Sequence, residues 1–228
     1  MRIAFVGDSL TAGLPGCSYL AVLRQHLPGH TLVNLGRGND TVVSLHRRIA
    51  GRQFAKPFDL AFLWVGINDA GQHLSWYHGA LSTLRGQRQA RHMDEFRACY
   101  RETLQSLLRV SRRVVAVAPL LKGEDLGSPL NHQVAALARA VRELAQEVDR
   151  VEFLDLRPAF AARLDGRPIS GYLPRSALRV TWDALTLWTD AQVDRRSRQR
   201  GLHLTLDGLH LNRAGAEIAA EAFLGLIE

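Results

Sequence analysis

Cysteine is scarce in this chain of 228 residues, and long apolar runs are missing. Two cysteines are too few for a disulfide framework or a zinc site, and they suit a reducing compartment. No run approaches the roughly 20 apolar residues that span a bilayer. The apolar run after Arg2 stops at Gly7, far short of the core of a signal peptide. With Met1 as the native start, these features predict a cytoplasmic protein without stable membrane insertion.

Lysine is also scarce, because Lys56 and Lys122 are the only lysines among 29 basic residues and the rest are arginine. The net charge is +7, and a basic chain can bind nucleic acid. The arginines are spread along the chain, however, and only residues 195–200 form a cluster. A solvated surface accounts for them better, so we expect no nucleic-acid partner.

Motifs of several other enzyme classes are absent. The chain has no Gly-Lys-Ser/Thr phosphate loop, and the turn at residues 36–41 lacks the final glycine of a dinucleotide fingerprint. It has no Gly-x-Ser-x-Gly elbow, which argues against the α/β-hydrolase fold. His26 and His30 are separated by Pro28, which breaks a helix and makes a metal-binding pair improbable. The sequence implies no metal and no cofactor.

The composition is ordinary for a globular protein, with 46% hydrophobic and 22% charged residues. The length suits one α/β domain over residues 1–228. Short apolar runs alternate with helical patterns. The expected strands are 3–6, 31–35, 59–65, 114–118 and 151–156. The expected helices are 18–27, 41–54, 93–109, 129–148 and 213–226. Nearly continuous apolar runs are typical of parallel strands buried on both faces. The alternation therefore predicts a three-layer α/β/α sandwich.

Two segments interrupt the alternation, and we interpret both as insertions, at about residues 71–92 and 165–204. The first carries Trp76 and Tyr77. In the second, apolar residues at spacings of three and four predict one helical face; they are Leu178, Trp182, Leu185, Trp188 and Ala191. We expect this face to pack on the body of the domain. A sharper hypothesis makes Trp182 and Trp188 a lid or acyl-chain wall, with Trp76 and Tyr77 opposite.

Polar residues at the ends of the expected strands carry the chemistry, because the sites of such sheets lie beyond the carboxyl ends of the strands. Ser9 follows the first strand, where a nucleophile can be presented to a cleft. A serine nucleophile needs a base. Asp207 precedes His210 by three residues, so its carboxylate can accept from Nδ1–H and leave Nε2 free to take the serine proton. After the third strand, Asn68 can aim its amide at a developing oxyanion.

These pieces together resemble the SGNH hydrolases, the GDSL esterase/lipase superfamily. The motifs are Gly-Asp-Ser-Leu at residues 7–10, the turn at 36–41, Gly-Ile-Asn-Asp at 66–69 and Asp-Gly-Leu-His at 207–210. They occur in the family's order and span almost the whole chain. The resemblance implies a flavodoxin-like parallel sheet of five strands in the order 2-1-3-4-5.

By resemblance, Ser9 is the nucleophile, His210 the general base and acid, and Asp207 the group that orients His210. The oxyanion hole would combine the Ser9 backbone N–H, a second backbone N–H and the Asn68 side chain. The family's usual glycine in the second motif falls at Asn39, with Gly38 one place earlier. Either residue can be the backbone donor, and asparagine tolerates the positive φ that such a turn can require.

The resemblance implies a serine esterase that cleaves a small-molecule carboxylic ester through an acyl-enzyme. Two alternatives use the same machinery: an acyl-thioester hydrolase and a carbohydrate O-deacetylase. A third alternative, from a different class, is a catalytically inactive module that binds an acyl or glycan ligand. The sequence determines neither the natural substrate nor the oligomeric state.

Overall fold

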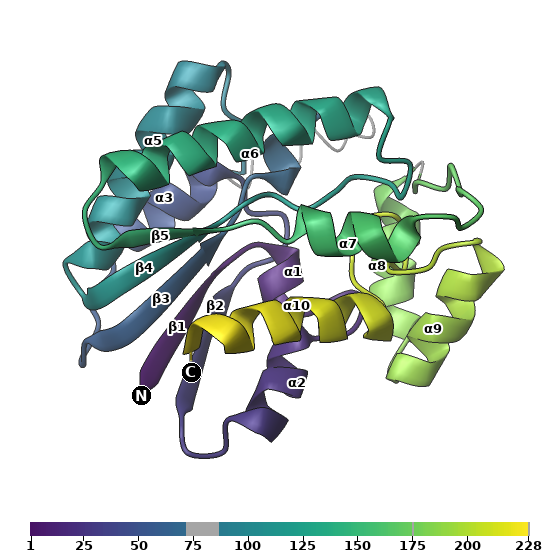
Figure 1. Ribbon diagram of the computed structural model, residues 1–228, viewed down its shortest axis with the longest axis horizontal. Coiled ribbons are helices and arrows are strands. Elements are labelled where there is room, and N and C mark those ends of the chain that lie inside the picture. Colours follow the sequence, from purple (N-terminus) through teal and green to yellow (C-terminus); the bar gives the residue numbers. More distant parts are fainter. Residues whose placement is uncertain (72–86, 175, 228) are drawn as a thin grey trace.

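The computed structural model describes residues 1–71, 87–174 and 176–227. In this part of the chain, parallel strands form one sheet in the order β2-β1-β3-β4-β5 (Figure 1). The strands are β1 (Arg2–Gly7), β2 (Thr31–Gly36), β3 (Phe58–Trp64), β4 (Ser111–Val117) and β5 (Val151–Leu154). Helices cover both faces of the sheet, so the predicted three-layer sandwich and strand order are confirmed.

The helices fall into two layers and one outlying pair (Figure 1). The first layer holds α3 (Val42–Ala50), α5 (Met93–Leu108) and α6 (Pro129–Glu147), and the second holds α2 (Tyr19–His26), α7 (Arg157–Leu164) and α10 (Arg213–Ile227). Two short elements follow strands directly, α1 (Ser9–Ala12) after β1 and the 3-10 helix η1 (Ile67–Asp69) after β3. The outlying pair is α8 (Ala177–Thr186) and α9 (Asp190–Gln199).

Strand burial follows position in the sheet. The central strands β1, β3 and β4 are buried along most of their length, whereas β2 and β5 consist mostly of half-buried and exposed residues because each lies at an edge. The register pairs Gly7 of β1 with Gly36 of β2 on one side and with Trp64 of β3 on the other. The carboxyl ends of these three strands therefore meet at one edge of the sheet, where the predicted site residues follow.

An aromatic cluster attaches α10 to the sheet. The Phe223 ring of α10 lies 4.7 Å from the Phe62 ring of β3 and 5.9 Å from the Phe5 ring of β1. It also stacks on the Tyr19 ring of α2, with the centroids 4.9 Å apart. Aromatic pairs at these distances add to the free energy that burial alone provides. Because α10 is fixed in this way, the loop that enters it, residues 207–212, is held at the carboxyl edge of the sheet.

The five predicted helices are present, although the one expected over residues 41–54 ends at Ala50, and α7 was not predicted. The expected continuous face from Leu178 to Ala191 is wrong, because the chain leaves α8 at Thr186 and starts α9 at Asp190. The cause is a capping box. The side chain of Thr189 accepts from the Gln192 N–H, and the Gln192 side chain accepts from the Thr189 N–H. Such a box favours the start of a new helix.

The expectation that the apolar face of α8 packs on the body of the domain is also wrong. Trp182 and Leu185 are 64% and 63% exposed, whereas Asp183 on the opposite face is 1% exposed. The physical reason is an ion pair, because Asp183 Oδ2 lies 2.7 Å from Nη2 of the buried Arg200. The inward face of α8 is thus held by charge rather than by its apolar residues.

Candidate active site

Ser9, His210 and Asp207 lie in a continuous chain of contacts at the carboxyl edge of the sheet. Ser9 Oγ is 3.0 Å from His210 Nε2, and His210 Nδ1 is 2.8 Å from Asp207 Oδ2. All three side chains are almost fully buried. With the proton on Nδ1, the imidazole donates to Asp207 and its Nε2 can accept the proton of the serine hydroxyl. This geometry is the one in which a serine hydroxyl becomes a nucleophile.

Ser9 reaches this place because β1 passes directly into α1. Asp8 caps α1, and its Oδ1 accepts from the Leu10 N–H at 3.0 Å. The preceding Gly7 has no room for a side chain, since a Cβ there would lie 2.3 Å from Thr11 Oγ1 and 2.4 Å from the Trp64 carbonyl oxygen. The sharp strand-to-helix turn therefore requires glycine at position 7 and presents Ser9 on the first turn of α1.

The Asp207 carboxylate fixes the backbone of the loop that carries both Asp207 and His210. Asp207 Oδ1 accepts from the backbone N–H groups of Leu209 and His210, at 3.1 and 2.9 Å, which leaves Oδ2 for the imidazole. Gly208 has a φ of 84°, a left-handed conformation that favours glycine. The Asp-Gly-x-His sequence thus brings the carboxylate into contact with the imidazole of the same loop.

The electrostatics of the pair favour the ionised forms. Burial disfavours the carboxylate of Asp207, but the charge and hydrogen bond of His210 and two backbone N–H groups outweigh it, so the pKa of Asp207 is lowered. Burial likewise disfavours imidazolium, yet the charge and hydrogen bond of Asp207 raise the pKa of His210 above its ordinary value. An imidazole held this way can receive a proton and still keep its orientation.

Asp8 is a second buried carboxyl group beside this site. Burial raises its pKa to about 7, although the Leu10 N–H and His210 act in the opposite direction. Its Oδ2 is buried and makes no hydrogen bond within the described residues. The folded state thus holds a proton on Asp8 in a pH range where the unfolded chain has released it. Because this folded-state pKa is raised, the contribution of Asp8 to the free energy of unfolding falls as pH rises from about 4 to about 7 and is level above that.

Replacement of Asp8 by asparagine removes this titration while keeping an oxygen for the Leu10 N–H. We expect the free energy of unfolding of Asp8→Asn, relative to wild type, to increase by about 2–4 kcal/mol between pH 5 and pH 8. Urea unfolding of both proteins at the two pH values measures the difference. A difference that is the same at both pH values would contradict the raised pKa of Asp8.

The turn after β2 offers two free backbone donors. The N–H groups of Arg37 and Asp40 are used, donating to the carbonyl oxygens of Gly7 and Arg37 at 3.0 and 3.2 Å. Those of Gly38 and Asn39 make no hydrogen bond with any described residue. Asn39 has a φ of 62°, so the left-handed position of the turn falls on asparagine. Glycine adopts this conformation most readily, and asparagine tolerates it better than most other residues. Asn39 can therefore stand where the family has glycine.

Asn68 lies against this turn. Its Nδ2 donates to the Asp40 carbonyl oxygen at 2.9 Å, which leaves the second N–H of the amide available. Its neighbour Asp69 accepts from the Val42 and Ala90 N–H groups at 2.8 and 3.1 Å. Burial raises the pKa of Asp69 to about 7 against these two hydrogen bonds. The loop after β3 is thus fastened to the turn after β2.

Two glutamines that sequence reasoning did not single out hold these loops. Gln87 is buried, and its Nε2 donates to the Gly38 carbonyl oxygen at 2.9 Å. Gln89 Nε2 donates to the carbonyl oxygens of Asn68 and Gly71, at 2.6 and 3.0 Å. No motif marks these residues, because each acts through one side chain on backbone that is distant in sequence.

Glu124, after β4, supports the loop that leads to Asp207. It is 3% exposed, and its Oε1 accepts from the Leu204 N–H, the Thr205 N–H and the Thr205 hydroxyl, at 2.8, 2.8 and 2.7 Å. The preceding Gly123 N–H donates to the Gly208 carbonyl oxygen. The segment after β4 therefore fixes the chain on both sides of Asp207, and the sequence contained no signal for this role.

Arg200 ties the second insertion to the same loop. Its Nη1 donates to the Leu206 carbonyl oxygen at 2.9 Å, one residue before Asp207, while its Nη2 pairs with Asp183 of α8. The guanidinium also lies over the Tyr172 ring, 4.8 Å from the centroid. Residues 195–200, read from sequence as a solvated basic cluster, thus include one arginine that is 9% exposed and structural.

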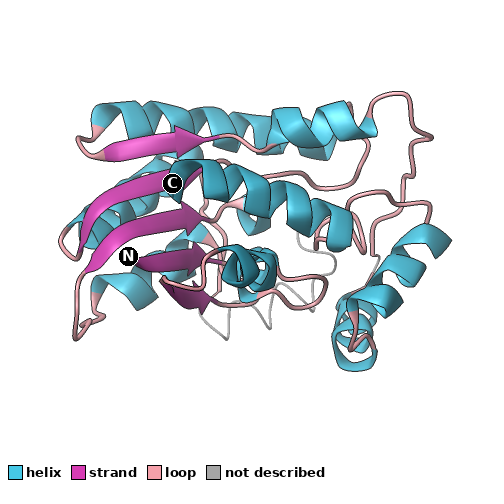
Figure 2. Cartoon of the chain, turned by 60° about the horizontal axis from the view of Figure 1, so that its bottom comes forward, coloured by secondary structure: helices cyan, strands magenta, loops and turns pink. Residues whose placement is uncertain are grey.

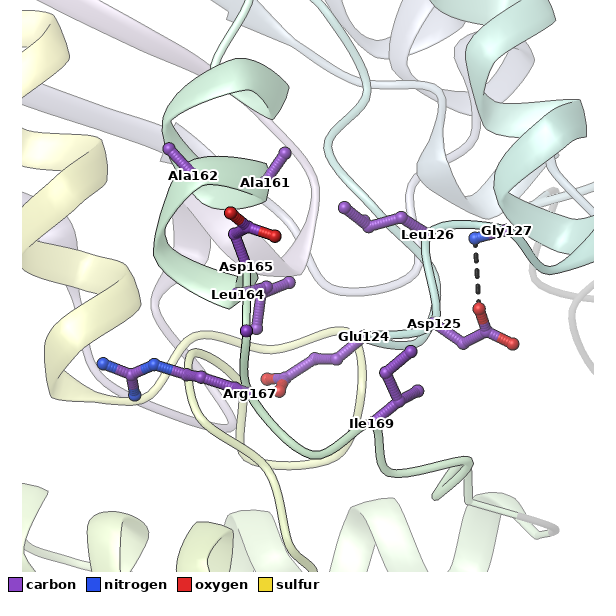
Figure 3. Close-up of a pocket in the computed structure, with 11 residues that line it drawn as sticks. Glu124, Asp125, Leu126, Gly127, Ala161, Ala162, Leu164, Asp165, Arg167 and Ile169 are labelled. Atoms are coloured by element: carbon purple, nitrogen blue, oxygen red, sulfur yellow. Dashed lines mark hydrogen bonds between the residues drawn. The ribbon is translucent and has the colours of Figure 1, made fainter.

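A pocket of about 490 Å³ opens beside these supports, between the loop after β4 and the end of α7 (Figure 3). Leu126 of the loop points toward Ala161 of α7 across it. Residues 124–127 and 164–167 form much of its wall. Neither Ser9 nor His210 lines it, so this pocket is separate from the serine site.

Of the four predicted substrate-binding aromatics, two lie within the described residues. Trp76 and Tyr77 lie outside the described residues. Trp182 is on the outer face of α8 and Trp188 follows that helix, and they are 64% and 83% exposed. Their role as a lid or acyl-chain wall stays a prediction.

A parallel sheet in the order 2-1-3-4-5, with serine, histidine and aspartate in contact at its carboxyl edge, is the arrangement expected of a serine hydrolase of the SGNH type. The chain belongs to the GDSL-like lipase/acylhydrolase family, whose model matches residues 5–218. A search of the curated proteins found no significant match.

Two solved structures illustrate the fold. The acetyl xylan esterase AlAXEase is 20% identical, with 100% of both chains covered and a TM-score of 0.68. The acetylxylan esterase Axe2 from Geobacillus stearothermophilus is 21% identical, with 99% of this chain and 93% of that one covered and a TM-score of 0.66. At these identities the similarity shows the fold alone.

Proposed function

We propose that the enzyme cleaves carboxylic esters through an acyl-enzyme on Ser9. The observation that carries the proposal is the contact of Ser9 Oγ with His210 Nε2, 3.0 Å apart across 201 positions of sequence. Ser9 Oγ attacks the ester carbonyl carbon while Nε2 takes the hydroxyl proton. Imidazolium, stabilised by Asp207, then gives this proton to the departing alcohol. A water molecule deprotonated by His210 attacks the acyl-enzyme and releases the acid and the free serine.

The oxyanion of each tetrahedral intermediate is proposed to accept from three donors: the Ser9 N–H, the Asn39 N–H and the Asn68 amide. Asn39 is chosen over Gly38 because it has the left-handed φ of 62° at the position that glycine occupies in the family. Supporting this set, the Asn68 amide is anchored on the Asp40 carbonyl oxygen, one residue beyond Asn39. Fixed donors of this kind stabilise the charge that develops on the carbonyl oxygen.

Replacement of Asn68 by alanine should lower kcat by about a hundredfold or more, because one oxyanion donor is lost. KM should change much less, since the donor acts on the transition state. Asn68→Asp is the matched variant. It keeps the size of the side chain but replaces the donor by an acceptor, so its kcat should be at least as low. A kcat of Asn68→Ala within a few-fold of wild type, with both variants folded, would remove Asn68 from the oxyanion hole.

The substrate class is tested by comparing nitrophenyl acetate, butyrate, octanoate and palmitate, each with wild type and Ser9→Ala. Nitrophenolate is an easy leaving group, so a poorly matched pocket still reveals an active serine. Turnover that is lost in Ser9→Ala supports the proposal, and the chain-length profile narrows the acyl group. Equal rates in both proteins, or none in either, would refute it and favour a ligand-binding module.

Carbohydrate O-deacetylation is the second candidate, favoured by the acetyl xylan esterases of similar fold. Acetylated xylooligosaccharides compared with a short acyl-CoA separate it from thioester hydrolysis. We also propose a reducing compartment such as the cytoplasm. Its support is that Cys17 and Cys99 are both free thiols.

A further inference from the structure

The outer face of α8 carries an apolar stripe that no described residue covers. We define the α8 stripe as Leu178, Trp182 and Leu185 with Trp188 just beyond the helix, and these side chains are 63–83% exposed. Exposed apolar residues that occur singly are ordinary on protein surfaces. A contiguous set that includes two tryptophans indicates a binding surface.

The fold fixes this outward orientation. Asp183, on the opposite face of the helix, is 1% exposed and paired with Arg200, and Leu187 packs against the hydrophobic core. Turning the α8 stripe inward would expose Leu187 and break a buried ion pair, which is strongly destabilising when one partner is left behind. The α8 stripe therefore faces away from the described part of the chain.

Unpaired arginines accompany the α8 stripe. Arg179 is next to Leu178 on the helix, and Arg195 and Arg198 lie on the outer side of the adjoining α9; all three are exposed. The ion pairs of these two helices use other arginines: Asp183 pairs with Arg196 and Arg200, and Asp194 pairs with Arg213. Within the described residues, no carboxylate pairs with Arg179, Arg195 or Arg198. The surface therefore combines apolar side chains with uncompensated positive charge.

The position of the helices makes this surface accessible to a flat partner. Figures 1 and 2 show α8 and α9 at one end of the molecule, beyond the carboxyl ends of the strands and apart from the two helical layers. Arg200 connects this end to the Leu206 carbonyl oxygen, one residue before Asp207. The end of the molecule that carries the α8 stripe is thus linked to the loop of Asp207.

We propose that the α8 stripe and the arginines Arg179, Arg195 and Arg198 dock the protein on an anionic lipid surface. A helix with Trp and Leu on one face and basic residues beside them is suited to the boundary between headgroups and acyl chains. Each arginine near such a surface adds to the attraction, because the surface potential of anionic lipids is negative. This docking is peripheral: within the described residues, no helix is long and apolar enough to cross a bilayer.

The charges disfavour a second copy of the chain as the occupant. A two-fold dimer would place the same patch against itself and bring like-charged arginines together. A stable interface also needs roughly 800 Å² from each partner, contributed by some 20–30 residues. The α8 stripe has only four residues, three on a helix of ten residues and Trp188 just beyond it. An anionic surface complements the charge and needs no such area.

Sedimentation with lipid vesicles tests the proposal without using enzyme activity, so it can fail while the proposed hydrolysis stands. Wild type should bind vesicles of equal phosphatidylglycerol and phosphatidylcholine and bind pure phosphatidylcholine at least about tenfold more weakly. Binding should fall as salt rises from about 0.1 M to about 1 M, where the screening length shortens from about 10 Å to about 3 Å.

Two double variants separate the contributions. One double variant combines Trp182→Ser with Trp188→Ser, and the other combines Arg195→Gln with Arg198→Gln. Each should weaken vesicle binding by about tenfold or more. The matched control is Arg47→Gln with Arg139→Gln, which removes the same charge from exposed positions on α3 and α6 and should bind as wild type does.

Three outcomes would overturn the proposal. The first is no binding to anionic vesicles, and the second is binding that the control lowers as much as the Arg195 and Arg198 variant. The third is a dimer by light scattering that the tryptophan variant converts to a monomer, with no vesicle binding, which would make the α8 stripe an interface between copies.

Discussion

Replacement of Ser9 by alanine is expected to lower kcat/KM for ester hydrolysis by about 10⁵-fold or more, because the nucleophile is lost while the fold is not. The side chain is 5% exposed, and the hydroxyl contacts the imidazole at 3.0 Å. Removing one oxygen atom leaves the backbone N–H of residue 9 in place. Steady-state kinetics on a nitrophenyl ester, beside a thermal melt, measure the two effects separately.

Ser18→Ala is the matched control for this variant. Ser18 precedes α2 and makes no capping hydrogen bond with its side chain, so its loss should leave kcat/KM within about twofold of wild type. Ser9→Ala activity within tenfold of wild type would mean that another group attacks the ester.

The second large effect is expected for Asp207→Asn, a loss in kcat of about 10⁴-fold. An amide at this position can donate to Nδ1, which moves the imidazole proton to Nε2 and leaves no acceptor for the Ser9 hydroxyl. The loop itself should persist, because the asparagine oxygen can still accept from the Leu209 and His210 N–H groups. Circular dichroism should therefore be unchanged.

The pH dependence of this variant follows from the pKa shifts. Asp207 raises the pKa of His210, so wild-type activity is lost as pH falls through that raised value. Residual activity of Asp207→Asn should be lost at a lower pH.

The stabilisation from His210 is fully present below its ordinary pKa of about 6.5 and lost above its raised pKa; that from Asp207 is present above about 4. The difference in unfolding free energy between wild type and Asp207→Asn should therefore be largest between about pH 4 and about pH 6.5. An unshifted activity profile with kcat near wild type would contradict the role of Asp207.

Much of the fold could be predicted because it depends on local pattern. The buried central strands read as continuous apolar runs, and parallel strands place their carboxyl ends at one edge. Ser9 and Asn68 follow strands that end at that edge, and Asp207 lies in the loop that leads into the last helix, so topology allows the three to meet. The strand order came from the family resemblance. The division into one domain with two insertions stays a prediction.

The supports of the site could not be predicted, because they are single side chains acting on distant backbone. Glu124 binds the backbone at Leu204 and Thr205, about eighty positions away, and Gln87 binds Gly38 across 49 positions. No periodicity or motif encodes such contacts.

The α8 stripe shows a different limit of sequence reasoning. Spacing indicates that a helix has an apolar face, but it does not indicate which face turns inward. In α8 the inward face is the one with Asp183, because Asp183 pairs with the buried Arg200. The spacing also continued through Thr189, where a capping box starts a new helix.

Labelling with a fluorophosphonate shows whether Ser9 is the nucleophile, because such a reagent phosphonylates an activated serine and forms a stable adduct. We expect one adduct per chain, located on Ser9 by peptide mass spectrometry, with activity lost in proportion to labelling. Ser9→Ala should remain unlabelled, and Asp207→Asn should react far more slowly. Inactivation with the adduct on another residue, or full ester hydrolysis by an enzyme whose Ser9 never reacts, would contradict this role of Ser9.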